Sequence, residues 1–145
     1  MAGAIPEGEL PDDLAIKGPT RVLRRVPPGR YNLETGAPDS STFDKDGDDP
    51  GTSVTLWLSD DDLRIVSEPH PDFGIVMIDV ETLRAEELRI AFVHEDGNPN
   101  HCEVYGGRSK SKRRRLSSAA QWIKYPIDFP ETLKAIAPLW KASDV

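Results

Sequence analysis

The sequence predicts an α+β fold, with a small mixed or antiparallel sheet of four to five strands and two C-terminal helices packed on it. Short apolar segments with the period of a strand recur between residues 20 and 105, whereas the longest helical pattern follows residue 108. The strand-like and helix-like segments do not alternate regularly, as they would in a parallel sheet of βαβ units. A length of 145 residues is ordinary for one such domain.

Five segments have the apolar pattern of a strand. In one of them, Val54 and Leu56 alternate with Thr55 and Trp57, which places the two pairs on opposite faces. Another, from Gly74 to Asp79, is almost uninterrupted in its apolar residues and is therefore expected to be buried. The five segments are residues 20–26, 53–58, 74–79, 89–93 and 101–105.

Two helices are predicted between the strands. Ser59 is a favourable N-cap, and the three aspartates that follow it suit the first turn of a helix that continues to Val66. Residues 80–88 also carry apolar side chains at helical spacing.

Two more helices are predicted near the C-terminus. The first begins near Ser109 or Ser111 and ends at Tyr125, because the residue before a proline avoids the helical conformation. Pro138 is expected to kink or shorten the second. Their apolar stripes are Leu116, Ala119, Ala120 and Ile123, and then Leu133, Ile136, Ala137 and Trp140.

Two segments lack any periodicity. Residues 1–18 are rich in proline, glycine and acidic residues and are predicted to be a flexible acidic tail. Residues 27–52 contain four prolines among glycines and polar residues and are predicted to form a long mobile loop. Residues 19–145 then make up a single α+β domain around that loop.

Composition limits the classes of protein to which the chain can belong. Its longest uninterrupted apolar run is far shorter than the roughly 18 residues of a membrane helix, and the N-terminal residues lack the pattern of a signal peptide. A single cysteine, Cys102, excludes an internal disulfide and suits a reducing compartment. We therefore expect a cytoplasmic protein that does not bind membranes, and no motif predicts a cofactor or a metal.

The charges are distributed unevenly along the chain. The net charge is −7, from 18 basic and 25 acidic residues, yet the segment from Val104 to Ile127 contains no acidic residue. Seven basic residues fall within it, so the remainder holds 11 basic and 25 acidic residues, a net charge of −14. Six of the seven form the basic segment, residues 108–115: Arg108, Lys110, Lys112, Arg113, Arg114 and Arg115.

The basic segment predicts an anionic partner. Positive side chains in the first turns of a helix oppose the helix dipole, at a cost of roughly 0.3–1 kcal/mol for each exposed charge, so the chain has no stability reason to gather them there. The free N–H groups of that helix end and the guanidinium groups are suited to an anion. The partner is either the acidic surface of another protein or a ligand that carries phosphate. Nucleic acid is disfavoured by the net charge and by the absence of an aromatic residue within the segment.

The alternative is that the basic segment pairs with the protein's own acids. Residues 44–49 and 60–62 supply enough aspartates for this, and runs of surface charge are commonly solvated or paired internally. The sequence does not decide whether the segment pairs with the 44–49 loop.

Two metal sites are considered and set aside. Residues 43–48 begin like a calcium-binding EF-hand loop, but Asp49 stands where the loop requires glycine and Thr55 where it requires glutamate. His94 and His101 bracket a turn between two strands. Their apolar residues favour the register that brings Ile90 and Phe92 together with Cys102 and Val104, and this turns the two histidines to opposite faces.

The same register gathers His101, Glu103 and Tyr105 on one face of their strand, which then leads into the basic segment. This face is ordinarily the polar outer side of a sheet. It also supports a second hypothesis, a small enzyme that acts on a phosphorylated or nucleotide substrate. His101 would then be the acid–base group, Glu103 would orient it, and Arg108, Arg113 and Arg114 would hold the phosphate. The first hypothesis remains a small binding or adaptor protein that docks an anionic partner through the basic segment.

Overall fold

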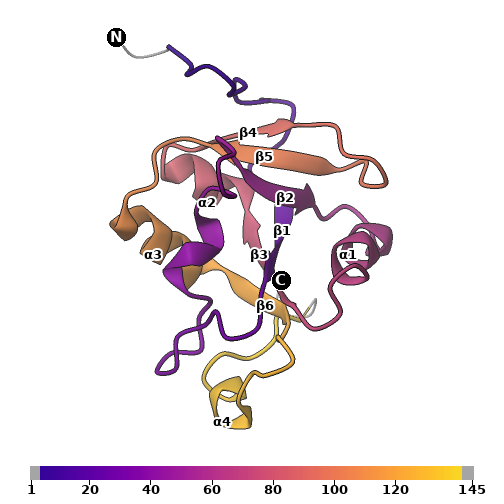
Figure 1. Cartoon of the computed structure of the whole chain (residues 1–145), viewed down its shortest axis with the longest axis vertical. Coiled ribbons are helices and arrows are strands. Elements are labelled where there is room, and N and C mark those ends of the chain that lie inside the picture. Colours follow the sequence, from indigo (N-terminus) through magenta and orange to yellow (C-terminus); the bar gives the residue numbers. More distant parts are fainter. Residues whose placement is uncertain (1–3, 142–145) are drawn as a thin grey trace.

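The structure, a computed structural model, describes residues 4–141 of the chain. Within this range one antiparallel sheet of six strands, in the order β4-β5-β2-β1-β3-β6, crosses the middle of the molecule (Figure 1). The five predicted strands are present, and the sheet has one strand more than expected. The strands are β1 (Arg21–Val26), β2 (Thr52–Leu56), β3 (Gly74–Asp79), β4 (Arg89–Phe92), β5 (His101–Tyr105) and β6 (Gln121–Lys124).

Short helices lie on both faces of the sheet. Among residues 4–141, no helix is long and apolar enough to cross a membrane. The helices are α1 (Asp60–Ser67), α2 (Val80–Ala85), α3 (Lys110–Ala119) and α4 (Glu131–Lys134), with a 3-10 turn η1 (Ser40–Phe43).

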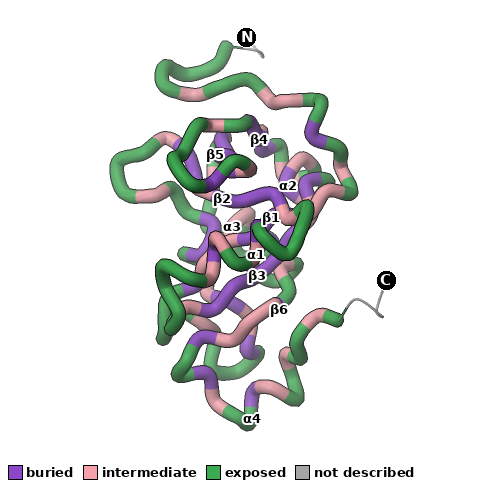
Figure 2. The backbone as a smooth tube through the Cα atoms, turned by 90° about the vertical axis from the view of Figure 1, so that its right-hand side faces the viewer, coloured by how far each residue is buried: buried purple, intermediate pink, exposed green. Residues whose placement is uncertain are grey.

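Successive residues of the strands point to two apolar cores, one on each face. Val22 and Val76 belong to the larger core, which α2 and α3 cover with side chains such as Leu116. Their neighbours Leu23 and Ile75 belong to the smaller core, which α1 covers. The buried residues follow the sheet through the centre of the molecule (Figure 2). The predicted packing of two C-terminal helices on the sheet is therefore wrong in detail, since α1 and α2 come from the middle of the chain.

The first C-terminal helix is shorter than predicted. α3 ends at Ala119, and residues 121–124 form β6, which pairs with β3. In β6, Trp122 joins the larger core and Ile123 packs against the smaller one, which is the alternation of a strand. Without β6, the backbone groups along that side of the buried strand β3 would lack partners, and this outweighs one further turn of helix.

Two other predicted helices also end early. α2 stops at Ala85 instead of Leu88, because Glu87 adopts a left-handed backbone (φ 63°) and the Leu88 N–H bonds back to the Leu83 carbonyl. α4 is a single turn, Glu131–Lys134, in agreement with the expectation that Pro138 shortens this helix.

The two segments without periodicity both contact the domain. In the described part of the 1–18 segment, Asp13 donates its N–H to the Ile90 carbonyl at 2.8 Å, and Ile16 is buried in the larger core. Residues 27–52 include η1, which packs against α3, and Phe43 is buried in the same core. Within the described residues, both segments therefore contribute apolar side chains to the larger core.

Candidate functional site

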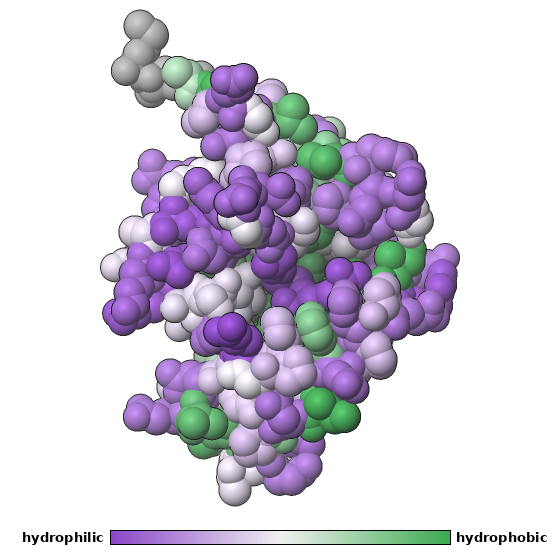
Figure 3. Space-filling view, in the orientation of Figure 1, coloured by the Kyte–Doolittle hydropathy of each residue, from purple (hydrophilic) through white to green (hydrophobic). Residues whose placement is uncertain are grey.

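The basic segment begins α3 at the periphery of the molecule, on a side where the surface is largely hydrophilic (Figures 1 and 3). Ser109 is the N-cap, and its hydroxyl accepts a hydrogen bond from the Lys112 N–H at 3.2 Å. Both starting points that the sequence allowed, Ser109 and Ser111, lie within one turn of the observed start. The six basic side chains then separate into two groups.

Three of them are held by the protein itself. Arg108 is half-buried and donates to the carbonyl oxygens of Gly106 and Val104, and burial lowers the pKa of its guanidinium. Arg113 pairs with Asp44 at 3.3 Å. Arg115 donates two hydrogen bonds to the Glu86 carboxylate, at 2.9 and 2.8 Å, and these lower the pKa of Glu86.

The other three are Lys110, Lys112 and Arg114. Their side chains form no hydrogen bond or ion pair within the described part of the chain, although the charge of Lys112 also acts on Glu86. Lys110 and Arg114 are exposed and four residues apart, so they share one side of α3, whereas Lys112, two residues from each, is half-buried and lies on the other flank of the helix. We call these three residues the outward basic surface.

The face of β5 that carries His101, Glu103 and Tyr105 is covered, whereas the sequence suggested the outer side of a sheet. All three residues are buried. The segment that leads from η1 into β2 lies over Glu103 and Tyr105, because a Cβ atom on Gly51 would come within 2.9 Å of the Tyr105 ring and 3.1 Å of the Glu103 Cβ. Only glycine fits this close approach. The face is therefore an interior polar region.

The predicted register of β4 and β5 is confirmed. Ile90 pairs with Val104 and Phe92 with Cys102, while Ala91 lies opposite Glu103. The two histidines consequently lie on opposite faces of the sheet. His94 is exposed and contacts Asp96 at 2.9 Å, whereas only 7% of His101 is exposed.

His101 is held in one orientation. Its Nδ1 lies 2.8 Å from the Val93 carbonyl oxygen, which only accepts, so Nδ1 carries a proton and donates it to that carbonyl. Nε2 is buried and has no hydrogen-bond partner among the described residues. It lies 3.6 Å from the Glu103 carboxylate and 3.9 Å from that of Glu95. Burial raises the pKa of Glu103, and the charge of His101 and a hydrogen bond from Ser53 only partly oppose this.

A pocket of about 420 Å³ opens beside His101, between the sheet, the end of α1 and the turn at residues 95–100. Leu23, Val66 and Phe73 give it apolar walls. A hydrogen bond connects the 95–100 turn to α1: the Asn100 amide nitrogen donates to the Asp62 carboxylate at 2.8 Å. Glu95 and Asn98 of this turn line the pocket.

Asn98 is the second polar side chain deep in this pocket, with 7% of it exposed. Its amide nitrogen donates to Thr55 Oγ1 at 2.9 Å and to Glu95 Oε2 at 3.2 Å, and a carboxylate oxygen can face only a donor. The amide oxygen Oδ1 therefore points elsewhere, and it is buried without a partner in the described structure.

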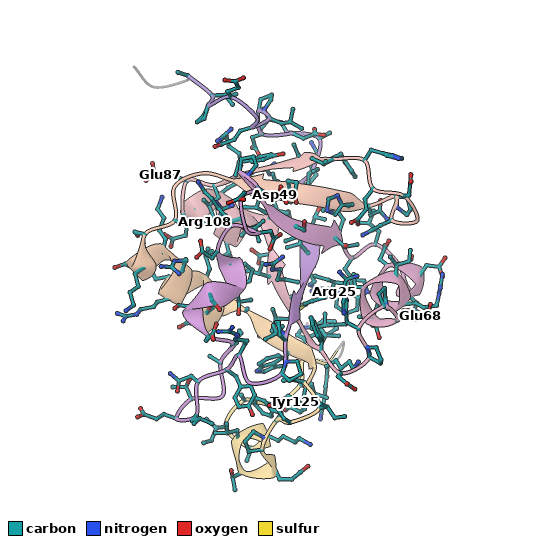
Figure 4. The ribbon with its side chains drawn as sticks, in the orientation of Figure 1. Arg25, Asp49, Glu68, Glu87, Arg108 and Tyr125 are labelled. Carbon is teal, nitrogen blue, oxygen red and sulfur yellow. The ribbon has the colours of Figure 1, made fainter. Side chains whose placement is uncertain are left out.

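Two arginines of β1 also line the pocket, and neither belongs to the basic segment. Arg24 is paired with Asp46 at 2.7 Å and donates to the Thr42 carbonyl. Arg25 lies between β1 and α1 (Figure 4) and donates from Nε to the Val66 carbonyl at 2.7 Å. Its Nη1 group makes no hydrogen bond in residues 4–141.

The predicted enzymatic site is assembled only in part. His101 lines the pocket with Glu103 next to it, but the expected phosphate-binding residues Arg108, Arg113 and Arg114 do not line it. They lie toward α3, where Arg108 sits beside the end of β5 (Figure 4). The topology separates them because β5 runs away from the pocket before α3 begins.

Aspartates of the 44–49 segment form hydrogen bonds and ion pairs with other parts of the protein. The Asp46 carboxylate accepts from Arg24 and from the Ser53 N–H at 2.7 Å; burial acts to raise its pKa, but these hydrogen bonds and the Arg24 charge lower it. Asp44 pairs with Arg113. No cluster of three or more metal-binding side chains occurs among the described residues.

Sequence reasoning missed Glu95 and Asn98. Arg25 stands within an apolar strand, two residues after Leu23. It therefore lies on the face of β1 that points to the smaller core. Glu95 and Asn98 belong to a turn-rich stretch, and nothing in the sequence shows which tertiary surface such a turn faces.

Comparisons with protein-family models, with curated proteins and with solved structures found no match to this chain.

Proposed function

We propose that this chain is a binding or adaptor protein that docks the acidic surface of another protein through the outward basic surface. One observation carries the proposal: within residues 4–141, Lys110, Lys112 and Arg114 form no hydrogen bond or ion pair, although neighbouring Arg113 and Arg115 each pair with an acid. Acids of the protein are thus within reach of α3, and among the described residues they form ion pairs with only two of its basic side chains.

The energetics of α3 support the same proposal. Lys110 and Arg114 are like charges four residues apart, and both lie in the first turns, where positive charge is unfavourable. Together these effects cost about 1 kcal/mol in the isolated protein. An acidic partner offsets both effects, because it brings negative charge to the positive end of the helix and next to the two basic side chains.

An acidic protein suits this surface better than nucleic acid does. The chain outside the 104–127 segment carries a net charge of −14, which repels a long polyanion beyond the patch. Phosphate binding along a duplex also needs an extended row of basic residues, whereas this surface has three.

The test compares two triple variants with equal net charge. The first replaces Lys110, Lys112 and Arg114 with glutamine; the control replaces Lys17, Arg30 and Lys45, which are exposed and lie outside α3. Binding of a fluorescent oligoglutamate peptide is measured by anisotropy over a range of NaCl concentrations. We expect the first variant to bind at least about tenfold more weakly than the control, and the affinity of the wild type to fall steeply with salt. Equal loss in both variants rejects the surface, and tighter binding of a DNA duplex of matched charge rejects an acidic protein as the partner.

A second candidate is a small enzyme with His101 as the acid–base group. The fixed ring and the unpartnered Nε2 at a pocket support it. A phosphorylated substrate lacks support, since the expected arginines are absent from that pocket.

A further inference from the structure

We infer that the acidic partner binds as an extended peptide segment that places a large apolar side chain in a groove beside the outward basic surface. This inference deepens the proposed function and rests on it. It depends on two neighbouring pockets, one that contains Arg114 and one with apolar walls, which share part of their lining.

The first pocket lies along α3, has a volume of about 320 Å³ and is lined there by Arg114, Ser117 and Ser118. Residues 32–40 form its opposite wall, and a hydrogen bond of 2.8 Å from Ser117 Oγ to the Asp39 carbonyl joins the two walls. The Asp39 carboxylate also lines this pocket, but it accepts from the Ser41 N–H as the N-cap of η1. Arg114 forms no ion pair among the described residues, so its charge is available to a ligand.

The second pocket is apolar. It has a volume of about 400 Å³ and lies between the end of α3, β6 and the segment after α4, where Trp122 and Trp140 line it. Ile136 and Leu139 line it too, and they are 62% and 37% exposed. All of its lining residues, within the described part of the chain, are uncharged. Large apolar side chains that are exposed together around a hollow indicate a binding site for an apolar group.

The two pockets form one continuous groove. They share Thr35, Ala37 and Ser118. Ser118 follows Arg114 by four residues and Lys110 by eight, so the three lie along one ridge of α3. This ridge leads from the basic residues toward the apolar pocket at the end of the helix, where the chain continues into β6 (Figure 1).

This arrangement determines the chemistry of the partner segment. Its acidic side chains pair with Lys110 and Arg114, and a side chain of the size of phenylalanine fills the apolar pocket. Arg114 and Ser118 are about 6 Å apart along the helix axis, a distance that an extended chain covers in about two residues. The apolar residue is therefore expected about two residues from the acids.

Side chains, rather than strand pairing, supply the recognition at β6. The carbonyl of Trp122 already accepts a hydrogen bond from the Trp140 N–H at 2.8 Å. This bond occupies the backbone of β6 at the wall of the apolar pocket, so a peptide cannot add to the sheet at that position.

The experiment compares two fluorescent peptides of equal charge. The first has a run of glutamates with Ser-Gly-Phe after it and Phe-Gly-Ser before it, so that a phenylalanine is available in either chain direction. The second has serine in place of both phenylalanines. By anisotropy we expect the wild-type chain to bind the phenylalanine peptide at least about tenfold more tightly. This ratio should persist as NaCl weakens the binding of both peptides, because salt screens ion pairs and not apolar burial. Equal affinities overturn the groove and leave the proposed docking intact, whereas binding of neither peptide overturns both.

Two exposed isoleucines provide matched variants that locate the apolar residue. Ile136→Gln alters the groove, and Ile127→Gln is the control, since Ile127 is 74% exposed and lines neither pocket. We expect Ile136→Gln to reduce the ratio of the two peptide affinities at least about threefold, with binding of the serine peptide unchanged. That unchanged binding also shows that the variant is folded. A ratio that Ile136→Gln leaves intact, or that Ile127→Gln reduces equally, overturns the assignment.

A second copy of this chain is the alternative occupant, because its own Leu10 and Leu14 are exposed among acidic residues. Light scattering after size-exclusion chromatography distinguishes the two. We expect a monomer at the concentrations used for anisotropy. A dimer that Ile136→Gln dissociates would assign the groove to self-association and overturn a different protein as its occupant.

Discussion

At the scale of single residues, the most unusual feature is that polar side chains of β5 are buried. Glu103 is a carboxylate kept within a covered face of the sheet, next to His101 and under the Gly51 backbone. Burial raises its pKa, and the charges of Asp46 and Asp49 act in the same direction. The folded protein therefore binds a proton at Glu103 more tightly than the unfolded chain does.

This shift gives Glu103 a definite effect on stability. Because its folded pKa lies above the ordinary value, its contribution to the free energy of unfolding falls as the pH rises from the ordinary pKa through the folded one. Glu103→Gln keeps the shape and removes the charge, so we expect a higher Tm than the wild type at pH 8 and almost the same Tm near pH 4.

Thermal unfolding followed by circular dichroism at both pH values checks this expectation. Glu34→Gln is the control, since Glu34 is exposed and the net charge changes equally. A Tm difference for Glu103→Gln that is the same at both pH values would contradict the assignment of the shift to Glu103.

The sequence identified only part of the residues that matter at this scale. His101 and Glu103 are recognisable because a two-residue period and the apolar pattern of β4 determine their common face. Their burial is not recognisable, since it depends on a glycine 50 residues away in the chain that lets the backbone approach Tyr105. The pairing of Arg113 with Asp44, 69 residues away, is in contrast one of the alternatives that the sequence leaves open.

At the scale of elements, local signals predicted starts better than ends. Ser59 and Ser109 begin their helices as expected, because an N-cap acts on the N–H groups next to it. The end of α3 was predicted wrongly, since the spacing of Leu116, Ala119, Ala120 and Ile123 fits a helix and only the unpaired side of β3 makes residues 121–124 a strand. Pairing with a distant strand leaves no mark on local periodicity.

β6 gives a prediction about packing. At the start of β3, a Cβ atom on Gly74 would lie 2.6 Å from Pro126 Cδ and 2.7 Å from the Trp122 ring, both on or just after β6. Gly74→Ala should therefore force β3 and β6 apart and lower the free energy of unfolding by about 1–3 kcal/mol.

Urea denaturation measures that change. Gly107→Ala is the matched control, because no atom lies within 4 Å of a Cβ at that position, and it should change stability by less than about 0.5 kcal/mol. Equal stability of the Gly74→Ala variant and the wild type would contradict the close contact.

At the scale of the whole molecule, the fold consists of two apolar cores separated by one sheet. Cys102 belongs to the larger core, is fully buried, and has its pKa raised to about 12 by burial. Only the thiolate reacts with a disulfide reagent, so the folded protein should protect this residue by both access and ionisation.

Cys102 is therefore a reporter of global unfolding. In Ellman's reagent at pH 8 we expect no measurable reaction of the folded chain over minutes and stoichiometric reaction in denaturant. The denaturant midpoint for the reaction should coincide with that for circular dichroism. Reaction well below that midpoint would show that the β4–β5 side of the sheet opens before the remainder.

The N-terminal segment bears on whether copies of this protein can associate through the edges of their sheets. β4 is an outermost strand of the sheet, so one of its sides pairs with no other strand. On that side the Ile90 N–H donates to the Asp12 carboxylate, and the Ile90 carbonyl accepts from the Asp13 N–H. An outer strand with vacant backbone groups recruits strands from other molecules and seeds aggregation. Asp12 and Asp13 therefore cover the backbone groups of Ile90 at this edge, and a neighbouring chain cannot pair with these groups while the two residues are in place.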